Sequence, residues 1–173
     1  MKKLFNTSLL MLVCLALTTV FTACDPEDKT KIDENEKNLA FLCGSETIAD
    51  GSTFTSTTLD STMQALGITR FAPGISLVGD CDGKIIVEVK SLNETMIEVC
   101  AFSSCQITLP LLNWATSVEG DITAGQELAL DIHYTPIGDA THHRAEVLIT
   151  AYYEGYEEKA ISFKLVMTDA KEE

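Results

Sequence analysis

The sequence predicts an all-β protein, an antiparallel β-sandwich of about seven to nine strands. Apolar and polar residues alternate with a period of two along several runs of the chain. Turn-forming residues bound these runs, and only one short segment is expected to be helical. Because successive side chains of a strand point to opposite faces, this alternation indicates sheets with one buried and one solvated face.

The clearest run of alternation is residues 84–90, in which Ile85, Val87 and Val89 share one face. Glycine, asparagine or proline residues mark the turns between the runs. Residues 59–66 are predicted to form one or two turns of helix. Four later runs alternate in the same way, at residues 96–102, 128–134, 144–153 and 161–167.

The N-terminus has the layout of an export signal. Lys2 and Lys3 precede residues 9–21, a mostly apolar stretch that is too short to span a hydrocarbon core of about 30 Å comfortably. The stretch runs into Phe-Thr-Ala-Cys at residues 21–24. This ending resembles the signal of bacterial lipoproteins, although phenylalanine stands where leucine is usual.

In that family the signal is removed before the cysteine, and the cysteine receives lipid. The resemblance implies a signal peptide at residues 1–23 and a lipidated Cys24 that anchors the protein in a membrane. Two or more acyl chains suffice for stable anchoring, because each buried methylene contributes about 0.8 kcal/mol. The alternative is an unlipidated secreted protein that is cut near Ala23.

Residues 24–40 are predicted to form a flexible acidic stalk, followed by the β-sandwich domain at residues 41–173. Ile32 is the only aliphatic residue between positions 25 and 38, so the segment buries too little apolar area to offset its ordering entropy. The acidic cluster at residues 25–28 resembles the surface-export signal of Bacteroidota lipoproteins. That resemblance implies an outer-membrane lipoprotein that faces the cell surface, with the periplasmic face as the alternative.

The charge of the chain limits its partners. It carries 26 acidic and 12 basic residues, a formal net charge of −14. A field of this sign repels phosphate backbones, so nucleic acid is not expected as a partner. It also disfavours adhesion of the domain to anionic lipid headgroups, so the membrane is expected as a partner through the N-terminal lipid.

The chain has six cysteines, of which one leaves with the predicted signal and Cys24 takes the lipid. The even number that remains predicts disulfides outside the cytoplasm, with three connectivities. The close spacing of Cys100 and Cys105 favours a local bridge, which leaves Cys43 and Cys81 for the second. A zinc site is not predicted from these thiols, because the paired Cys-x-x-Cys spacing is absent.

Two stretches resemble a module of secreted bacterial proteins, residues 91–105 (SLNETMIEVCAFSSC) and residues 122–155 (ITAGQELALDIHYTPIGDATHHRAEVLITAYYEG). The module is immunoglobulin-like or fibronectin-III-like, and the likeness covers residues 84–168. Similar modules in Bacteroidota surface and secretion-system cargo proteins carry a short loop with two cysteines, with glycine common where Ser103 and Ser104 stand here. The resemblance implies an immunoglobulin-like sandwich and carries over no functional residues.

No catalytic, cofactor or metal site is predicted, and an enzyme is not expected. Asp131 and His133 share one strand face, and His142 and His143 follow across the next turn. Because His142 and His143 are adjacent, they should point to opposite faces, which argues against three or four converging zinc ligands. The turn at residues 80–83 starts like a calcium loop but lacks the closing glutamate.

Three aromatic residues are candidate binding residues, Tyr152 and Tyr156 near a hairpin tip and Trp114 in a loop-like stretch. Exposed aromatics stack on sugar rings or anchor proteins, so the expected partner is an unidentified protein or glycan. The alternative is that Trp114 and Tyr153 close the ends of the core. The tripeptide that begins at Asp60 resembles the O-glycosylation signal of exported Bacteroidota proteins, which implies a glycan on Ser61.

These observations predict a non-catalytic, lipid-anchored cell-envelope protein. The first hypothesis is a surface binding or adhesion module that engages its partner through loops at the far end of the sandwich. The second is a structural or assembly component that pairs with another envelope protein through sheet edges.

Overall fold

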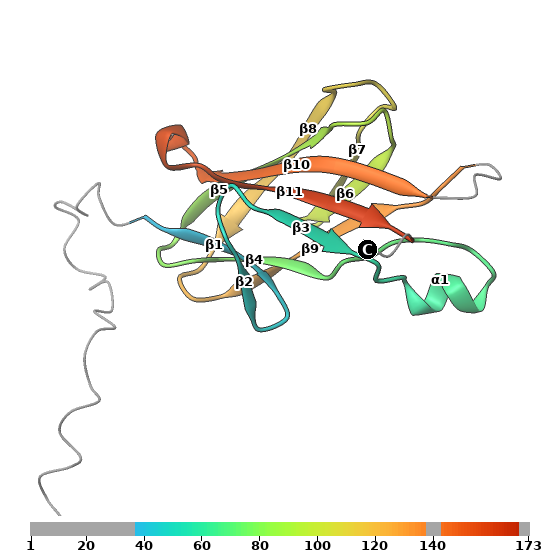
Figure 1. Cartoon of the computed structure of the whole chain (residues 1–173). Helices are drawn as coiled ribbons and strands as arrows, with labels where there is room; N and C mark the ends of the chain where they lie inside the picture. The colour runs from blue at the N-terminus through green and yellow to red at the C-terminus, as the bar shows by residue number, and fades with distance from the viewer. Residues whose placement is uncertain (1–36, 138–142, 170–173) are drawn as a thin grey trace, which may run out of the picture. The chain divides into compact units, whose positions relative to one another are not determined.

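The computed structural model describes residues 37–137 and 143–169 (Figure 1). The predicted signal peptide at residues 1–23, the predicted lipid-anchor residue Cys24 and most of the predicted stalk lie outside the described residues. Within the described ranges, no helix is long and apolar enough to cross a membrane.

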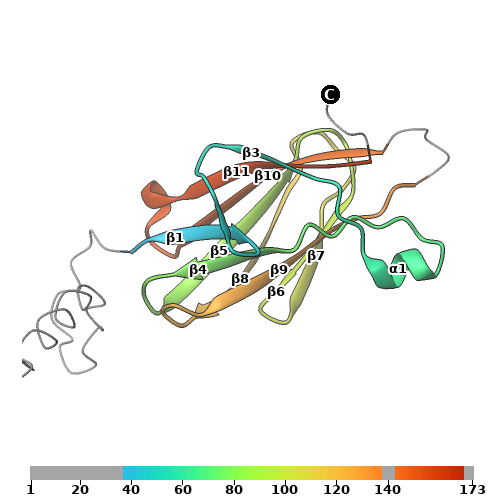
Figure 2. The same cartoon turned by 60° about the horizontal axis from the view of Figure 1, so that its bottom comes forward.

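The described residues form two β-sheets that face each other (Figure 1, Figure 2). The first sheet has six strands in the order β2-β1-β4-β9-β6-β7, and the second has five in the order β3-β11-β10-β5-β8. Among the described strands, β3 runs parallel to β11 and the other pairs are antiparallel. The strand bounds are β1 Leu39–Cys43, β2 Glu46–Ile48, β3 Thr53–Ser56, β4 Ile75–Gly79, β5 Gly83–Ser91, β6 Ile97–Ala101, β7 Ser104–Ile107, β8 Ala115–Ile122, β9 Glu127–Tyr134, β10 Arg144–Tyr153 and β11 Ile161–Thr168.

The core lies between the sheets and is built from the alternating residues. Ile85, Val87 and Val89 of β5 are fully buried, and the residues that pair with them on β10 are buried too. Phe41 of the first sheet meets Phe163 of the second, with ring centroids 4.8 Å apart. Each buried side chain of this size contributes about 1.5–3 kcal/mol, so the facing apolar surfaces hold the two sheets together.

The predicted all-β, immunoglobulin-like antiparallel sandwich is confirmed, with eleven described strands instead of about seven to nine. All five predicted runs are strands, namely β5, β6, β9, β10 and β11. The additional strands are short or lack a clean alternation: β2 has three residues, and all four residues of β7 are exposed. Pairing with neighbouring strands, rather than a sequence pattern, makes these segments part of the sheets.

The first sheet begins two residues before the predicted domain start at residue 41. Leu39 and Ala40, which the sequence assigns to the stalk, are the first residues of β1. They pair with Gly79 and Val78 of β4. The ladder with β4 therefore decides where the first sheet starts.

The predicted helical segment at residues 59–66 contains one short helix, α1, Ser61–Ala65. Asp60 caps this helix, because its carboxylate accepts hydrogen bonds from the N–H groups of Thr62 and Met63 at 2.9 and 3.1 Å. Ser61, the predicted O-glycosylation residue, is exposed at the first position of α1.

The predicted bridge between Cys43 and Cys81 is wrong, since the two cysteines are not joined. Strand register gives the reason. Cys43 pairs with Ile75 at one end of the β1–β4 ladder, and Cys81 lies beyond the other end, past Gly79. Cys43 lies opposite Ile75, and the six residues from Ile75 to Cys81 span about 20 Å when extended. A disulfide needs Cα atoms about 4.4–6.8 Å apart.

A buried hydrogen bond fixes the end of the sandwich at which the described chain begins. The hydroxyl of Tyr153 donates to the carbonyl oxygen of Cys81 at 2.8 Å, and the side chain is 2% exposed. Burial raises the pKa of Tyr153 to about 12. Gly79 leaves the space that the hydroxyl occupies, because a Cβ at this position would collide with it. The bond ties β10 to the turn after β4.

We expect Tyr153→Phe to lower the free energy of unfolding by about 1–3 kcal/mol, because it removes a buried hydrogen bond to the carbonyl oxygen of Cys81. Tyr152→Phe is the matched control: its hydroxyl donates to Glu88 Oε1 at 3.0 Å on the exposed face of β10, so we expect a loss below about 0.5 kcal/mol. Denaturant unfolding of both variants measures the difference. Equal losses in the two variants would contradict the assignment of a structural role to the Tyr153–Cys81 bond.

Candidate binding surface

The loop between β7 and β8, residues 108–114, carries a group of exposed apolar side chains. Its three leucines are 45 to 57% exposed, and Trp114 is 42% exposed. The backbone of the loop is nevertheless fixed: the N–H of Trp114 donates to the carbonyl of Leu111 at 3.0 Å, and the N–H of Asn113 donates to that of Ser91 at 2.9 Å. These bonds hold the loop while its apolar side chains remain in contact with solvent, so Trp114 does not close the core.

We name the exposed apolar side chains at this end of the sandwich the distal apolar surface. The loop contributes four of them, and the others come from just before β6, from the end of β7 and from the chain after β9. Their exposed fractions range from 39% to 80%. The members are Met96, Ile107, Leu109, Leu111, Leu112, Trp114 and Ile137.

Two shallow hollows join parts of the distal apolar surface. One, of about 230 Å³, is bordered by Met96, Pro110 and Ile137, with Glu94 at its margin. The other, of about 150 Å³, is bordered by Met96 and Ile107 and by the polar side chains of Glu98, His133 and Thr135. Because Met96 borders both hollows, side chains from segments that are distant in sequence adjoin on one face of the molecule.

The distal apolar surface lies at the end of the sandwich opposite to the first described residues. Lys90 of β5 pairs with Ala115 at the surface end, and Gly83 starts β5 at the other end. At that other end, the N–H of Asn38 donates to Asp80 Oδ1 at 2.8 Å. The nine residues of β5 separate the two ends by about 30 Å.

The two tyrosines that the sequence analysis proposed for binding lie at the end opposite to Trp114, and both are half-buried. The ring of Tyr156 is covered by Lys37, whose Nζ lies 4.4 Å from the ring centroid. The hydroxyl of Tyr152 donates to Glu88 Oε1 at 3.0 Å. Both side chains therefore have contacts within the domain, and the structure does not bring them together with Trp114.

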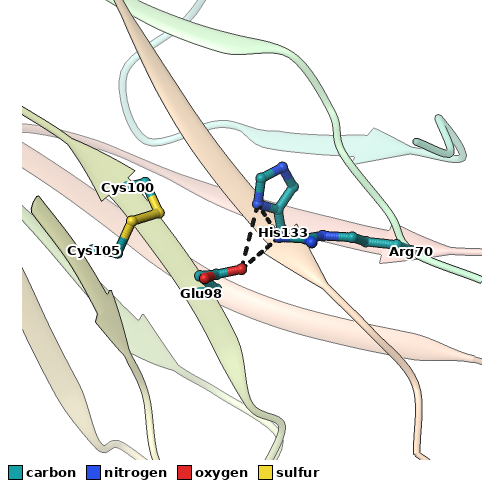
Figure 3. Close-up of a disulfide and its surroundings, with 5 residues drawn as sticks. All are labelled: Arg70, Glu98, Cys100, Cys105 and His133. Carbon is teal, nitrogen blue, oxygen red and sulfur yellow. Dashed lines mark hydrogen bonds and ion pairs between the residues drawn. A yellow bond between two sulfur atoms is a disulfide. The ribbon is translucent and has the colours of Figure 1, made fainter. Parts of the chain in front are cut away.

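An ion-pair cluster lies on the outer face of the first sheet (Figure 3). Arg70 Nη2 is 2.5 Å from Glu98 Oε2 and 2.7 Å from His133 Nδ1. Glu98 on β6 and His133 on β9 are direct cross-strand neighbours, whereas Arg70 belongs to the segment that follows α1. The cluster therefore ties this segment to the sheet.

The cluster also determines the charge state of its histidine. Desolvation by burial, and after it the positive charge of Arg70, lower the pKa of His133. The imidazole is thus held neutral, with Nδ1 accepting from the guanidinium. Asp131 has Cys100 as its partner in the strand register, while His133 contacts Arg70 and Glu98. His142 lies outside the described residues.

The predicted Cys100–Cys105 disulfide is confirmed, and it joins β6 to β7. The turn between them consists of Phe102 and Ser103, which have φ values of 51° and 61°. Positive φ at both central residues is the conformation of a type I′ hairpin turn, in which glycine or asparagine is usual. Phe102 lies against Gly120 of β8, where any Cβ would collide with its side chain. The hairpin tip thereby contacts the second sheet.

The acidic turn that starts like a calcium loop has structural contacts. Asp82 Oδ1 accepts from the N–H of Ala124 at 2.8 Å, and both carboxylate oxygens of Asp80 accept from Asn38. These bonds connect the turn after β4 to the turn before β9 and to the start of the described chain.

Sequence reasoning identified Trp114 but missed the remainder of the distal apolar surface. A signal was present in residues 107–114, where apolar residues do not alternate and a proline interrupts them. Such a stretch is a poor strand, so its apolar side chains were candidates for exposure. Met96 and Ile137 carry no comparable signal, because only the fold brings their segments next to the loop.

No protein-family model and no curated protein matches this chain. Among solved structures, the N-terminal domain of PorA is similar over 76% of this chain and 96% of that chain, with a TM-score of 0.52 and 13% identity. That likeness shows the fold alone.

Two further structures are more distant. A family 123 glycoside hydrolase from Clostridium perfringens has a TM-score of 0.40 and 8% identity, over 79% of this chain and 28% of that chain. A PapD-like domain of human CEP192 has a TM-score of 0.34 and 9% identity, over 90% of this chain and 99% of that chain. Neither carries an argument about the function of this chain.

We expect the stability of the domain to depend on the protonation of His133. Because its pKa is lower in the folded state than in the unfolded chain, the stabilisation is present above pH about 6.5 and is lost as the pH falls through the folded-state pKa. His133→Gln should therefore show a smaller drop in Tm between pH 7.5 and pH 5 than the wild type does. An equal drop in both proteins would contradict a neutral, Arg70-bound imidazole.

Proposed function

We propose that this chain is a non-catalytic, lipid-anchored cell-envelope protein that binds a protein partner through the distal apolar surface. The observation that carries the proposal is the exposure of seven large apolar side chains at one end of the sandwich. Removing one such side chain from water contributes about 1.5–3 kcal/mol, so exposed clusters of this kind favour a partner that covers them.

The composition of the surface favours a protein over a glycan. Trp114 is its single aromatic member, and the other six side chains are leucine, isoleucine or methionine. Sugar rings stack on aromatic faces and need polar groups around them. Aliphatic side chains and methionine suit the apolar centre of a protein interface, where the acidic margin at Glu94 would lie at the polar rim.

The anchoring part of the proposal rests on the N-terminal sequence. The ending of the apolar stretch at residues 21–24 supports acylation of Cys24, and the acidic residues that follow support the outer leaflet of the outer membrane. The first described residues lie at the end of the sandwich remote from the distal apolar surface. This arrangement of the two ends suits a protein that is anchored at one end and binds a partner at the other.

The non-catalytic part of the proposal rests on the engagement of the titratable groups. Within the described ranges, His133 accepts from Arg70, and Glu98 is paired with the same guanidinium. Glu98 and His133 border one of the two hollows, which is shallow and has Met96 and Ile107 on its other side. An arrangement of this kind offers a surface for contact rather than converging groups for bond cleavage.

A second candidate function is assembly through a sheet edge. β8, Ala115–Ile122, is an eight-residue edge strand of the second sheet and directly follows the loop of the distal apolar surface. An edge strand offers unpaired backbone groups to another strand. Glu119 and Asp121 lie exposed on β8, and charges at an edge oppose such pairing, so the loop surface is the preferred site.

For the binding proposal, we expect Leu112→Asp to weaken binding of the partner at least tenfold, because it places a charge among the exposed apolar side chains of the loop. The partner would first be identified by cross-linking on intact cells, and its affinity for the purified protein would be measured by calorimetry. Leu66→Asp is the matched control, since Leu66 is 69% exposed but lies at α1.

Equal binding by both variants would contradict the proposed surface. If Ser117→Pro in β8 abolished binding while Leu112→Asp did not, the edge-strand candidate would replace it. Thermal unfolding of each variant verifies that a lost interaction does not result from a lost fold.

For the anchor, we expect cells that express the wild type to incorporate radiolabelled palmitate into this chain, and Cys24→Ala to abolish the label and release the protein from the membrane fraction. Cys14→Ala is the control, because its residue lies inside the predicted signal peptide. Absence of label in the wild type, or equal label in Cys24→Ala, would overturn the lipid assignment. Whole-cell protease digestion then distinguishes the surface from the periplasmic face.

A further inference from the structure

The β6–β7 hairpin brings together three side chains whose atoms could ligate a metal once the disulfide is reduced. The sulfurs of Cys100 and Cys105 and a carboxylate oxygen of Glu98 all lie within 4.8 Å of one another. Cys100 and Cys105 are directly opposite each other on the two strands, and Glu98 precedes Cys100 by two residues on the same face of β6. The close-up shows the three side chains next to one another on this face (Figure 3).

We propose that reduction of the Cys100–Cys105 disulfide opens a Zn²⁺ site on this hairpin, with both thiolates and Glu98 as its protein ligands. Thiolate and carboxylate are ligands that Zn²⁺ accepts, at about 2.3 Å and 2.0–2.2 Å. In a tetrahedral site such ligand atoms lie about 3.4–3.8 Å apart, so small side-chain rotations from the present arrangement suffice. With three protein ligands, the fourth position is open to water.

The two oxygens of Glu98 have different surroundings. Oε2 is held by the guanidinium of Arg70, while the other oxygen lies on the side of the disulfide (Figure 3). The carboxylate can therefore keep its ion pair and still present an oxygen to the hairpin. Arg70 and His133 contact Oε2 of Glu98 and so fix the position of the carboxylate. Outer-shell partners orient metal ligands in the same way.

The site is accessible to a reductant and to a metal ion. Cys105 is exposed and Cys100 is half-buried. A shallow hollow of about 340 Å³ is bordered by both cysteines, the hairpin turn and Asp131. Asp131 adds negative charge beside the thiolates, which favours a cation and offsets part of the repulsion from Arg70.

The redox step is an exchange with a dithiol reductant. A thiolate of the reductant attacks one hairpin sulfur, so the Cys100–Cys105 bond breaks and a mixed disulfide forms. The second thiol of the reductant then attacks the mixed disulfide, which frees the hairpin cysteine and leaves the reductant as an internal disulfide. The hairpin gains two electrons and two protons and becomes two thiols. Binding of Zn²⁺ then displaces both thiol protons to solvent.

The fold of the hairpin does not depend on the disulfide alone. Four residue pairs align β6 with β7, and β6 also pairs with β9 in the sheet. Phe102 at the turn lies against Gly120 of β8. These contacts keep the two cysteines adjacent after reduction, so the ligands remain assembled for a metal ion.

The test is titration of the purified full chain with Co²⁺ and then Zn²⁺, with and without a phosphine reductant. The reduced wild type should bind about one equivalent of Co²⁺ at the hairpin, with thiolate-to-cobalt charge-transfer absorption and the visible bands of tetrahedral coordination, and Zn²⁺ should displace it. The oxidised chain should show neither band at this site. Glu98→Gln should weaken Zn²⁺ binding at least tenfold, whereas Glu94→Gln should not change it.

The double variant Cys100→Ser/Cys105→Ser is the key control, because it keeps Cys43 and Cys81 and the remaining cysteines of the chain. Loss of the charge-transfer band in this variant assigns the site to the hairpin. The proposal is overturned if the reduced wild type shows no such band, if the double variant shows the same band, or if Glu98→Gln binds Zn²⁺ as tightly as the wild type. Circular dichroism confirms that each variant retains its strands.

Discussion

The pairing of β5 with β10 is the interaction on which the rest of this structure depends. Seven residue pairs align the two strands at the centre of the second sheet, and every apolar residue that they direct inward is fully or almost fully buried. A shift of the register by one residue would turn Val87 and Val89 to solvent and bring Glu88 into the core. The burial of this face therefore fixes the register, and the register fixes where each connecting loop emerges.

The loops that emerge at the two ends have different chemistry. At the end near residue 37, the turns are bound to one another by carboxylates and by the hydroxyl of Tyr153. At the other end, the β7–β8 loop satisfies its backbone through Ser91 and leaves its leucines and Trp114 exposed. The domain thus has one internally bonded end and one apolar end, which is the physical basis for proposing a tether at the first and a partner at the second.

The outer face of the first sheet combines two constraints that act on neighbouring residues. The Arg70 guanidinium binds Glu98 and His133, and the Cys100–Cys105 disulfide holds the adjacent hairpin. Glu98 participates in both, as the ion-pair partner of Arg70 and as the neighbour of the two sulfurs. Glu98 therefore links the hairpin to the segment that follows α1.

The sequence by itself determined the all-β class, the five alternating strands and the local disulfide, because each depends on residues that are close along the chain. The alternation within 84–90 needs only neighbouring side chains, and a five-residue separation brings two cysteines together when a hairpin turn is centred between them. The strands β1, β2 and β7 were not predictable, since their order comes from pairing with distant partners.

The same difference between local patterns and distant contacts applies to the candidate site. Trp114 could be singled out as an exposed aromatic, but the tertiary structure alone decided that Met96 and Ile137 lie beside the loop, that Arg70 reaches Glu98 and that Cys43 and Cys81 stay apart. Contacts between residues far apart in the chain follow from sheet register, and register is set by how two whole faces bury each other rather than by any local pattern.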